Sequence, residues 1–223
     1  MKIDVLTLFP SMYRVLDESI IGKALQKGLF AVNVVNIRDY SLDKHKKVDD
    51  YPYGGGAGMV MMPGPLHDAI RAVDPEHRAV RIYLSPKGKR LDQKTVIELA
   101  GAERLLLVNG SYEGIDERVI QLDIDLELSI GDYVLTSGDY ASLVLIDAVA
   151  RYLPDVLGSE SSTEEESFSA GLLEYPHYTR PREFEGLSVP EVLVNGNHQL
   201  IAAWRKAESE RLTRERRPDL LER

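Results

Sequence analysis

Two glycine-punctuated loops hold the residues whose types and spacing favour binding of a small molecule. The segments are NGSYEGIDERV (109–119) and SIGDYVLTSGD (129–139), and each follows an apolar run. A backbone approaches a ligand closely only where no Cβ intervenes, and open α/β sheets build ligand sites from a strand followed by such a loop. Neither loop matches the glycine pattern of a dinucleotide site or a P-loop. The loops therefore predict a site for a nucleotide-like cofactor, bound by a backbone geometry that differs from that of the dinucleotide and P-loop motifs.

The second loop places apolar side chains beside a glycine turn. Ile130, Tyr133 and Leu135 surround Gly131 at a spacing that could hold a purine, with backbone groups reading its edge. A core strand followed by a tight turn has the same pattern, so both interpretations stay open from spacing alone.

A third glycine-rich segment, YGGGAG (53–58), has the composition of a phosphate-binding loop. It lacks the Lys-Ser/Thr ending of a P-loop and follows a polar segment instead of a strand. The alternative is a turn whose glycines adopt positive φ.

The acidic residues and histidines do not predict a metal site. Asp123, Asp125 and Glu127 alternate with apolar residues in LDIDLELS (122–129), without the central glycine and distal glutamate of a calcium loop. This alternation is typical of a half-buried strand edge. The histidines are scattered and lack ligand spacing: His45, His67, His77, His177 and His198.

Alternating strand and helix patterns must position these loops. Strands are expected at residues 1–9, 30–37, 80–84, 105–108 and 126–130, and helices at residues 11–27, 65–73, 93–100, 116–122 and 142–152. Asp92 is expected to cap the third of these helices. Residues 38–58 lack periodicity and read as a long loop. The alternation predicts an α/β domain with a mostly parallel sheet over residues 1–157.

The composition changes after this domain. Gly158–Gly171 (GSESSTEEESFSAG) is rich in serine and glutamate and is expected to be a flexible acidic linker. Residues 172–223 are expected to form a small second domain with a helix around residues 201–212.

Bulk properties narrow the class of protein. The 223 residues include 27 basic and 36 acidic side chains, for a formal charge of −9, yet basic residues cluster in DKHKK (43–47) and KGKR (87–90). The sequence has no cysteine, which excludes disulfide and thiolate–metal chemistry. No apolar window is long enough to span a bilayer, and MKIDVLTLFP reads as a strand instead of a signal peptide. A cytoplasmic protein is expected.

Five segments in one order carry a family resemblance. PYGGGAGMVM (52–61), YLSPKGKRLDQ (83–93), YEGIDERV (112–119), SIGDYVLTSGD and PHYTRP (176–181) together closely resemble the TrmD-type tRNA (guanine-N1)-methyltransferases. The resemblance extends from Phe9-Pro10 to Arg216–Leu221, which is nearly the whole chain. Any one segment alone would be a weak signal.

The resemblance implies a fold, a reaction and partners. It implies a trefoil-knot (SPOUT-type) α/β methyltransferase domain with a parallel sheet, followed by a small helical C-terminal domain that binds tRNA. It implies transfer of a methyl group from S-adenosylmethionine to N1 of guanosine 37 of tRNA, beside the anticodon, with a requirement for Mg²⁺ whose ligands are unknown. It also implies a homodimer whose active sites are shared between subunits.

The resemblance also assigns roles to residues. Arg151 is expected to contact the guanine, and Glu166 takes the position of the general base that removes the N1 proton. The expected cofactor-binding residues are Tyr83, Leu84, Ser85, Pro86, Gly88, Gly110, Tyr112, Glu113, Gly114, Ile130, Gly131, Asp132, Tyr133, Val134, Leu135 and Gly138.

The chain departs from the family pattern at the residue expected to be the general base. The family usually has aspartate in a DSF motif, whereas this chain reads Glu166-Ser167-Phe168, and Glu164 and Glu165 are close enough to serve instead. Other departures bear on cofactor or tRNA affinity: Tyr51, Ser111, Thr136-Ser137 and Ala141.

Three alternative functions remain from sequence alone. One is a related knotted enzyme that methylates another RNA nucleotide, and a second is an RNA-binding module without turnover. The third is a phosphate-binding enzyme that uses YGGGAG.

Overall fold

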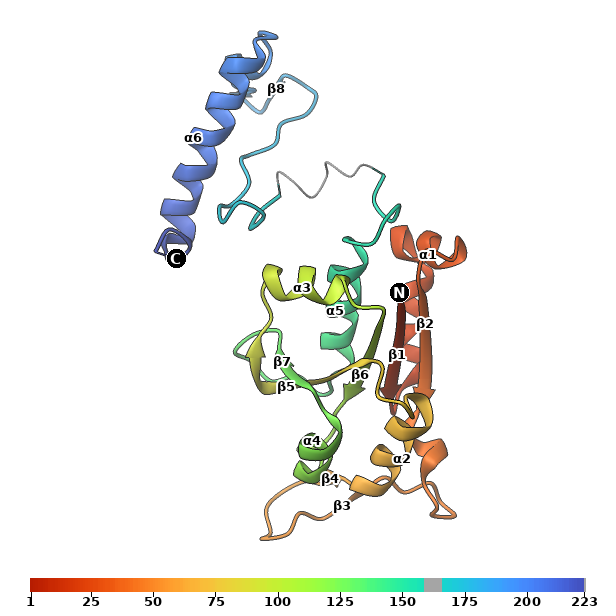
Figure 1. Ribbon diagram of the computed structural model, residues 1–223. Helices are drawn as coiled ribbons and strands as arrows, with labels where there is room; N and C mark the ends of the chain where they lie inside the picture. The colour runs from red at the N-terminus through yellow and green to blue at the C-terminus, as the bar shows by residue number, and fades with distance from the viewer. Residues whose placement is uncertain (159–165, 223) are drawn as a thin grey trace. The chain divides into compact units, whose positions relative to one another are not determined.

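The computed structural model describes residues 1–158 and 166–222 and divides the chain into two units (Figure 1). The first unit is Met1–Gly158 and the second is Ser159–Arg223.

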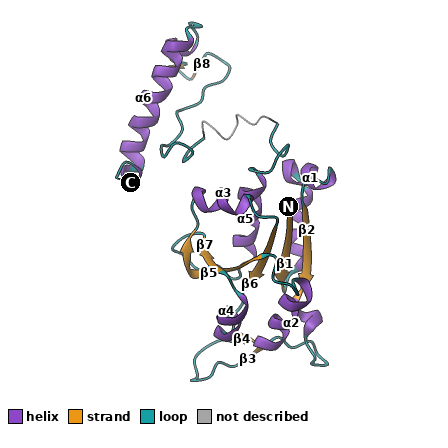
Figure 2. Cartoon of the chain, in the orientation of Figure 1, coloured by secondary structure: helices purple, strands orange, loops and turns teal. Residues whose placement is uncertain are grey.

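The first unit is built on a five-stranded parallel sheet with the order β2-β1-β6-β5-β7 (Figure 2). Its strands are β1 (Lys2–Thr7), β2 (Ala31–Asn36), β5 (Val80–Arg90), β6 (Arg104–Asn109) and β7 (Leu126–Ser129). The predicted α/β class with a parallel sheet is confirmed. Since β6, β5 and β7 are neighbours and run parallel, the carboxyl ends of β6 and β7 lie at one edge together with the middle of β5, and such edges are where α/β sheets bind ligands.

Helices cover both faces of the sheet. They are η1 (Pro10–Asp17), α1 (Ser19–Gln26), η2 (Ile37–Tyr40), α2 (Pro63–Val73), α3 (Gln93–Ala100), α4 (Glu117–Asp123) and α5 (Asp139–Ala150). Successive strand residues point to opposite faces, so Ile3 and Val5 share a core with residues of α3 and α5, while Leu6 shares the other core with residues of α2 and α4. Both faces are therefore buried, as the continuous apolar strands require.

Strand β5 is longer than the sequence predicts, because it bends around β7. The expected strand ends at Leu84, but β5 continues to Arg90. Both Leu84 and Lys89 pair with the same residue, Leu128 of β7. Between them, Gly88 lies so close to β7 that a Cβ there would be 2.4 Å from the Leu128 nitrogen. Only glycine permits this backbone approach.

Two helices begin or divide differently from their predictions. The helix expected at residues 11–27 is divided at Glu18, whose extended backbone separates η1 from α1. The tight return places the Asp17 carbonyl against Gly22, where a Cβ would leave no room. Helix α5 begins at Asp139, three residues before the expected start at Ser142, because its first turn buries a polar side chain that does not follow the apolar pattern.

The segment expected as a long loop contains short regular elements. Residues 38–58 include most of η2 and the strand β3 (Asp49–Asp50), which pairs antiparallel with β4 (Val60–Met61). The glycines of YGGGAG (54, 55, 56 and 58) all have positive φ, so the predicted turn is confirmed.

The acidic stretch LDIDLELS spans two elements. Only Leu126–Ser129 is a strand, and Asp123 is the last residue of α4. The buried Asp123 carboxylate contacts His67 Nδ1 at 2.6 Å and Arg81 at 3.6 Å, and Asp125 contacts His77 at 2.9 Å. These carboxylates therefore hold elements together through ion pairs. Among residues 1–158 and 166–222, His, Asp and Glu form no group of three suited to a metal ion.

The predicted cap of α3 is present and its contribution to stability can be measured. Asp92 Oδ1 accepts hydrogen bonds from the Thr95 backbone nitrogen at 2.9 Å and the Thr95 hydroxyl at 2.8 Å. We expect Asp92→Ala to lower the free energy of unfolding by about 1 kcal/mol, since it leaves helix N–H groups without a partner. Urea unfolding measures the loss, and Asp92→Ser should restore most of it. Equal stability of the alanine and serine variants would contradict the capping role.

The described part of the second unit has one long helix, α6 (His198–Arg216). It also contains β8 (Glu183–Phe184), β9 (Leu187–Ser188), η4 (Glu191–Leu193) and η5 (Pro218–Leu220). The segment before it attaches to α6, because the Leu173 nitrogen donates to the Thr213 hydroxyl at 2.9 Å and Arg205 lies 4.6 Å from the centre of the Tyr175 ring. In neither unit is a described helix both long enough and apolar enough to cross a bilayer.

Candidate cofactor site

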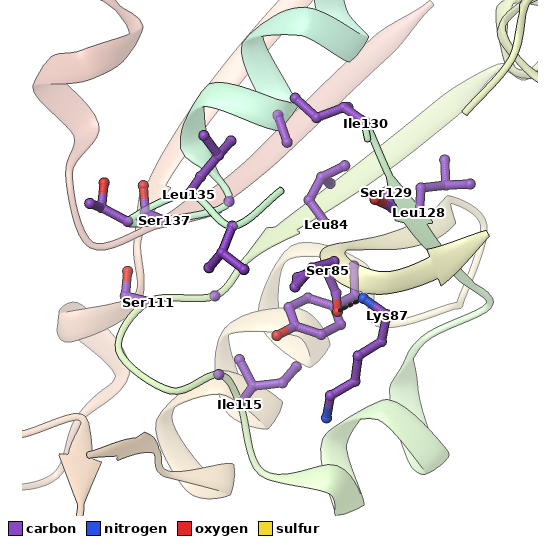
Figure 3. Close-up of a pocket in the computed structure, with 18 of the residues that line it drawn as sticks. Leu84, Ser85, Lys87, Ser111, Ile115, Leu128, Ser129, Ile130, Leu135 and Ser137 are labelled. Atoms are coloured by element: carbon purple, nitrogen blue, oxygen red, sulfur yellow. Dashed lines mark hydrogen bonds between the residues drawn. The ribbon is translucent and has the colours of Figure 1, made fainter. Parts of the chain in front are cut away.

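A cavity lies at the edge of the sheet where β6 and β7 end and where β5 changes its register against β7 (Figure 3). All of the predicted cofactor residues line it except Gly88 and Asp132: Tyr83, Leu84, Ser85, Pro86, Gly110, Tyr112, Glu113, Gly114, Ile130, Gly131, Tyr133, Val134, Leu135 and Gly138. The three segments that supply them are far apart in the sequence, and the parallel order of the strands brings them together. Gly88 instead contacts the backbone of β7, and Asp132 is exposed.

The loop after β6 closes over a buried tyrosine. A Cβ at Gly110 would lie 2.8 Å from the Tyr83 hydroxyl, so this position needs glycine. Burial, followed by the negative charge of Glu127, raises the pKa of Tyr83 to about 12. The Tyr83 hydroxyl therefore stays protonated at neutral pH and forms an uncharged part of the wall.

The loop after β7 is tied to the loop after β6. Gly138 N donates to Gly110 O at 2.9 Å, and Ser111 forms a β-bridge with Ser137. At the start of this loop Gly131 has φ +157, and a Cβ there would lie 2.4 Å from the Tyr133 ring. These bonds hold the two loops as facing walls of one cavity.

The YGGGAG turn lies beside the cavity instead of lining it. A Cβ at Gly58 would be 2.4 Å from the Glu113 carboxylate, and the Glu113 nitrogen donates to Met59 O at 3.0 Å. The turn therefore supports the loop after β6 from outside.

The cavity is chemically suited to a purine nucleoside. Leu84, Ile115, Leu128, Ile130 and Leu135 supply apolar walls, and all are labelled in Figure 3. The glycine loops add backbone donors and acceptors that can read a base edge. Lys87 and Glu113 are the charged residues of the lining, and they carry opposite charges. The residues present thus fit an adenosine-containing cofactor.

Several lining residues were not predicted. They are Ile115, Ile120, Leu128, Ser129, Thr136, Ser137 and Ala141, whereas Lys87 and Ser111 belong to loops that were predicted to hold the cofactor. The polar residues among them lie within or next to the sequence motifs that resemble the family, and this position could have indicated them. The apolar ones look like ordinary core residues in sequence, so no local signal distinguishes them.

The two expected catalytic residues belong to different units. Arg151 directly follows α5, where its nitrogen donates to Asp147 O, and it does not line the cavity. Glu166 belongs to the second unit and lines another cavity, beside α6, together with His198 and Arg205. The alternative bases Glu164 and Glu165 lie outside the described residues.

Known proteins match the chain over its whole length. A family model described as tRNA (Guanine-1)-methyltransferase TrmD matches residues 1–223. A protein of Carboxydothermus hydrogenoformans named tRNA (guanine-N(1)-)-methyltransferase is 57% identical over 222 residues, which cover 99% of this chain and 87% of that protein. A protein of the same name from Clostridium perfringens (strain SM101) is 54% identical over 222 residues, covering 100% of this chain and 94% of that protein. A protein of Clostridium botulinum (strain Hall) with that name is 55% identical over 220 residues, which cover 99% of this chain and 91% of that protein. The segments that form the cavity thus occur in a chain that belongs to the TrmD family of tRNA (guanine-1)-methyltransferases.

Proposed function

We propose that this protein is a tRNA (guanine-N1)-methyltransferase that transfers a methyl group from S-adenosylmethionine to N1 of guanosine 37. Family membership and the names of the relatives support the activity on tRNA guanine. The observation that carries the choice of donor is the convergence of three neighbouring strands and two glycine loops on one purine-compatible cavity.

The cavity residues would hold the donor by shape and backbone polarity. Ile130, Tyr133 and Leu135 would pack against adenine, while backbone groups of Gly110 and Gly131 would be available to polar atoms of the cofactor. The bound donor supplies an electrophilic methyl group on a sulfonium. The protein's part is to orient that group toward N1, and positioning of this kind contributes much of a transfer rate.

Methylation of guanine at N1 requires removal of a proton. N1 carries a hydrogen at neutral pH, so a carboxylate within hydrogen-bond reach must accept it. We assign this role to Glu166. As the proton leaves, negative charge develops on O6, and the guanidinium of Arg151 would stabilise that charge.

We also propose that the first unit is a trefoil knot. The irregular pairing of β5 with β7 supports it, because Leu84 and Lys89 both pair with Leu128 and Gly88 lies against the Leu128 backbone. After β7 the chain returns past Gly110 before α5 begins, which is the kind of crossing that threading requires. Knots are rare, and a close backbone crossing at a glycine is compatible with one.

A homodimer with shared active sites is part of the proposal. Helix α5 is apolar on more than its buried face, since Tyr140 and Val144 are 53% and 49% exposed. A second copy of the chain could cover these side chains. We further propose a cytoplasmic enzyme that requires Mg²⁺, for which no protein ligand is assigned.

The second unit and the lysines near residue 45 are proposed to bind the tRNA backbone. The basic residues concerned are Lys44, Lys46, Lys47, Arg180, Arg205, Arg211, Arg214, Arg216 and Arg217. Some are already paired: Lys47 contacts Asp50 at 3.0 Å, and Arg211 contacts both Glu208 and Glu215. Paired cations release fewer counterions from RNA.

This difference predicts a salt effect. Lys44 forms no ion pair with residues in the described ranges, whereas the nearby Lys47 does. If Lys44 contacts phosphate, Lys44→Ala should reduce the slope of log affinity against log salt concentration by about 1. Lys47→Ala is the matched control and should change the slope less. Binding of unmodified tRNA at several salt concentrations measures both, and equal slopes for Lys44→Ala and the unchanged protein would remove Lys44 from the interface.

The proposed function is tested by methyl transfer from labelled S-adenosylmethionine to unmodified tRNA. Incorporation into tRNA with guanosine 37, and its loss when adenosine replaces that guanosine, is the expected result. The reverse preference would identify a related enzyme that modifies another nucleotide. Binding of tRNA without incorporation would identify a binding module.

A further inference from the structure

Four aspartates of the first unit are almost completely buried: Asp4, Asp74, Asp123 and Asp139. Three of them have cationic partners. Asp4 contacts Arg104 at 2.8 Å, Asp74 contacts Arg81 at 2.9 Å, and Asp123 contacts Arg71 at 3.3 Å. A buried carboxylate is costly unless it is paired, so these partners are expected.

Asp139 is the exception. Its side chain is 0% exposed, and Oδ1 accepts hydrogen bonds from Thr7 Oγ1 at 2.6 Å, Tyr13 OH at 3.0 Å and Asn109 Nδ2 at 3.2 Å. Its other oxygen, Oδ2, is buried and has no hydrogen-bond partner among the described residues. No side chain of the described residues forms an ion pair with it. The first turn of α5 offers only the partial positive charge of a helix end.

The hydrogen bonds around Asp139 converge on one carboxylate oxygen. Two hydroxyls and one amide nitrogen lie within 3.2 Å of Oδ1, and donors so placed stabilise a carboxylate. Burial and the charge of Asp139 raise the pKa of Tyr13, so Tyr13 remains a donor. Asn109 Nδ2 also donates to Tyr13 OH at 2.7 Å, and Ser142 Oγ donates to Asn109 Oδ1. The group is thus uncharged except for Asp139.

The position of Asp139 connects this charge to the cofactor cavity. Its neighbours Ser137, Gly138 and Ala141 line the cavity, and Asn109 immediately precedes the lining residue Gly110. The charges on the lining, Lys87 and Glu113, are of opposite sign. A carboxylate at Asp139 would therefore be a buried negative charge beside the cavity lining without a counter-charge from the protein. Solvent would screen its electrostatic interactions only weakly there.

We propose that Asp139 is a specificity-determining residue that makes the cavity favour the positively charged methyl donor over its neutral product. S-adenosylmethionine carries a sulfonium, and S-adenosylhomocysteine has an uncharged thioether at the same place. The two ligands are otherwise alike in charge, so only the sulfonium distinguishes their attraction to Asp139. The residue acts through the field at the cavity and not by contact with the reacting atoms. This inference rests on the proposed use of S-adenosylmethionine.

The test compares the affinities of the two ligands. Titration calorimetry gives the dissociation constants of S-adenosylmethionine and S-adenosylhomocysteine for the full chain and for Asp139→Asn, which keeps the shape but removes the charge. We expect the affinity ratio to shift by about tenfold toward the product, which corresponds to an interaction of about 1.4 kcal/mol between the two charges. Asp139→Ser is a second neutral variant in case the carboxamide prevents folding, and it should shift the ratio in the same direction.

Two controls separate charge from structure. Tyr13→Phe removes a donor to the same oxygen and should lower thermal stability without changing the affinity ratio. Asp147→Asn removes a charge from the exposed part of the same helix, where water screens it, and should also leave the ratio unchanged. An unchanged ratio in a folded Asp139→Asn variant, or an equal loss of both affinities, would overturn the inference. Failure of the unchanged protein to bind either ligand would instead reject the proposed function.

Discussion

Replacing Glu166 with glutamine is expected to lower the single-turnover rate of methyl transfer by about 10²- to 10⁴-fold. The reason is that a carboxamide cannot accept the N1 proton, whereas it keeps the size of the side chain. Because the base acts only in the chemical step, binding of S-adenosylmethionine should be little changed. Rapid-quench measurement with enzyme in excess over labelled tRNA gives the rate of this step.

The neighbouring glutamates provide matched controls for this prediction. Glu164→Gln and Glu165→Gln remove the same charge within two residues of Glu166 and are expected to retain nearly normal rates. Glu166→Asp restores the carboxylate that the family usually has and should recover part of the rate. If Glu166→Gln is nearly normal and Glu164→Gln or Glu165→Gln is slow, the base is one of these neighbours.

The second large effect is expected at Gly88. A Cβ in Gly88→Ala would lie 2.4 Å from the Leu128 nitrogen and 2.5 Å from the Glu127 carbonyl carbon. Backbone atoms cannot move away as a flexible side chain can, so β5 and β7 must separate. We expect a loss of about 3 kcal/mol in the free energy of unfolding, together with weaker donor binding because residues of both strands line the cavity. Urea unfolding and calorimetry measure the two effects.

Gly64 is the control for this substitution. It lies in the first turn of α2, and a Cβ there would meet no atom within 4 Å. Gly64→Ala is expected to change the free energy of unfolding by less than about 1 kcal/mol, since the helix preference of alanine is opposed by the following proline, Pro65. Equal stability of the Gly64 and Gly88 variants would show that the β5–β7 crossing is not tightly packed.

The parallel sheet and the cavity loops could be predicted because their signals are local. Apolar runs at Leu105–Val108 and Leu126–Ile130 are each followed by glycines, and the strands form where the pattern places them. The order of the strands then brings the loops together. Gly88 was expected to contact the cofactor, but its backbone lies against β7. Glycine is needed there because a Cβ would clash with β7, and the sequence does not show that a strand so distant along the chain passes so close.

The buried polar network could not be predicted from the sequence. Thr7, Asn109 and Asp139 are polar residues at strand and helix ends, where such residues are usually exposed. They become buried only because β1, β6 and α5 meet there, with bonds that span up to 132 positions. Similarly, β5 beyond Leu84 contains Pro86 and Gly88, which are typical of a turn. Long-range packing decides both features.

The central claim is that this chain methylates N1 of guanosine 37, and identification of the modified nucleoside tests it most directly. An unmodified tRNA transcript with guanosine 37 is incubated with S-adenosylmethionine and the protein, digested, and analysed by liquid chromatography and mass spectrometry. We predict 1-methylguanosine at position 37 and none in the transcript with adenosine 37. A methyl group on another atom or nucleotide, or no methylation by protein that binds both donor and tRNA, would contradict the account.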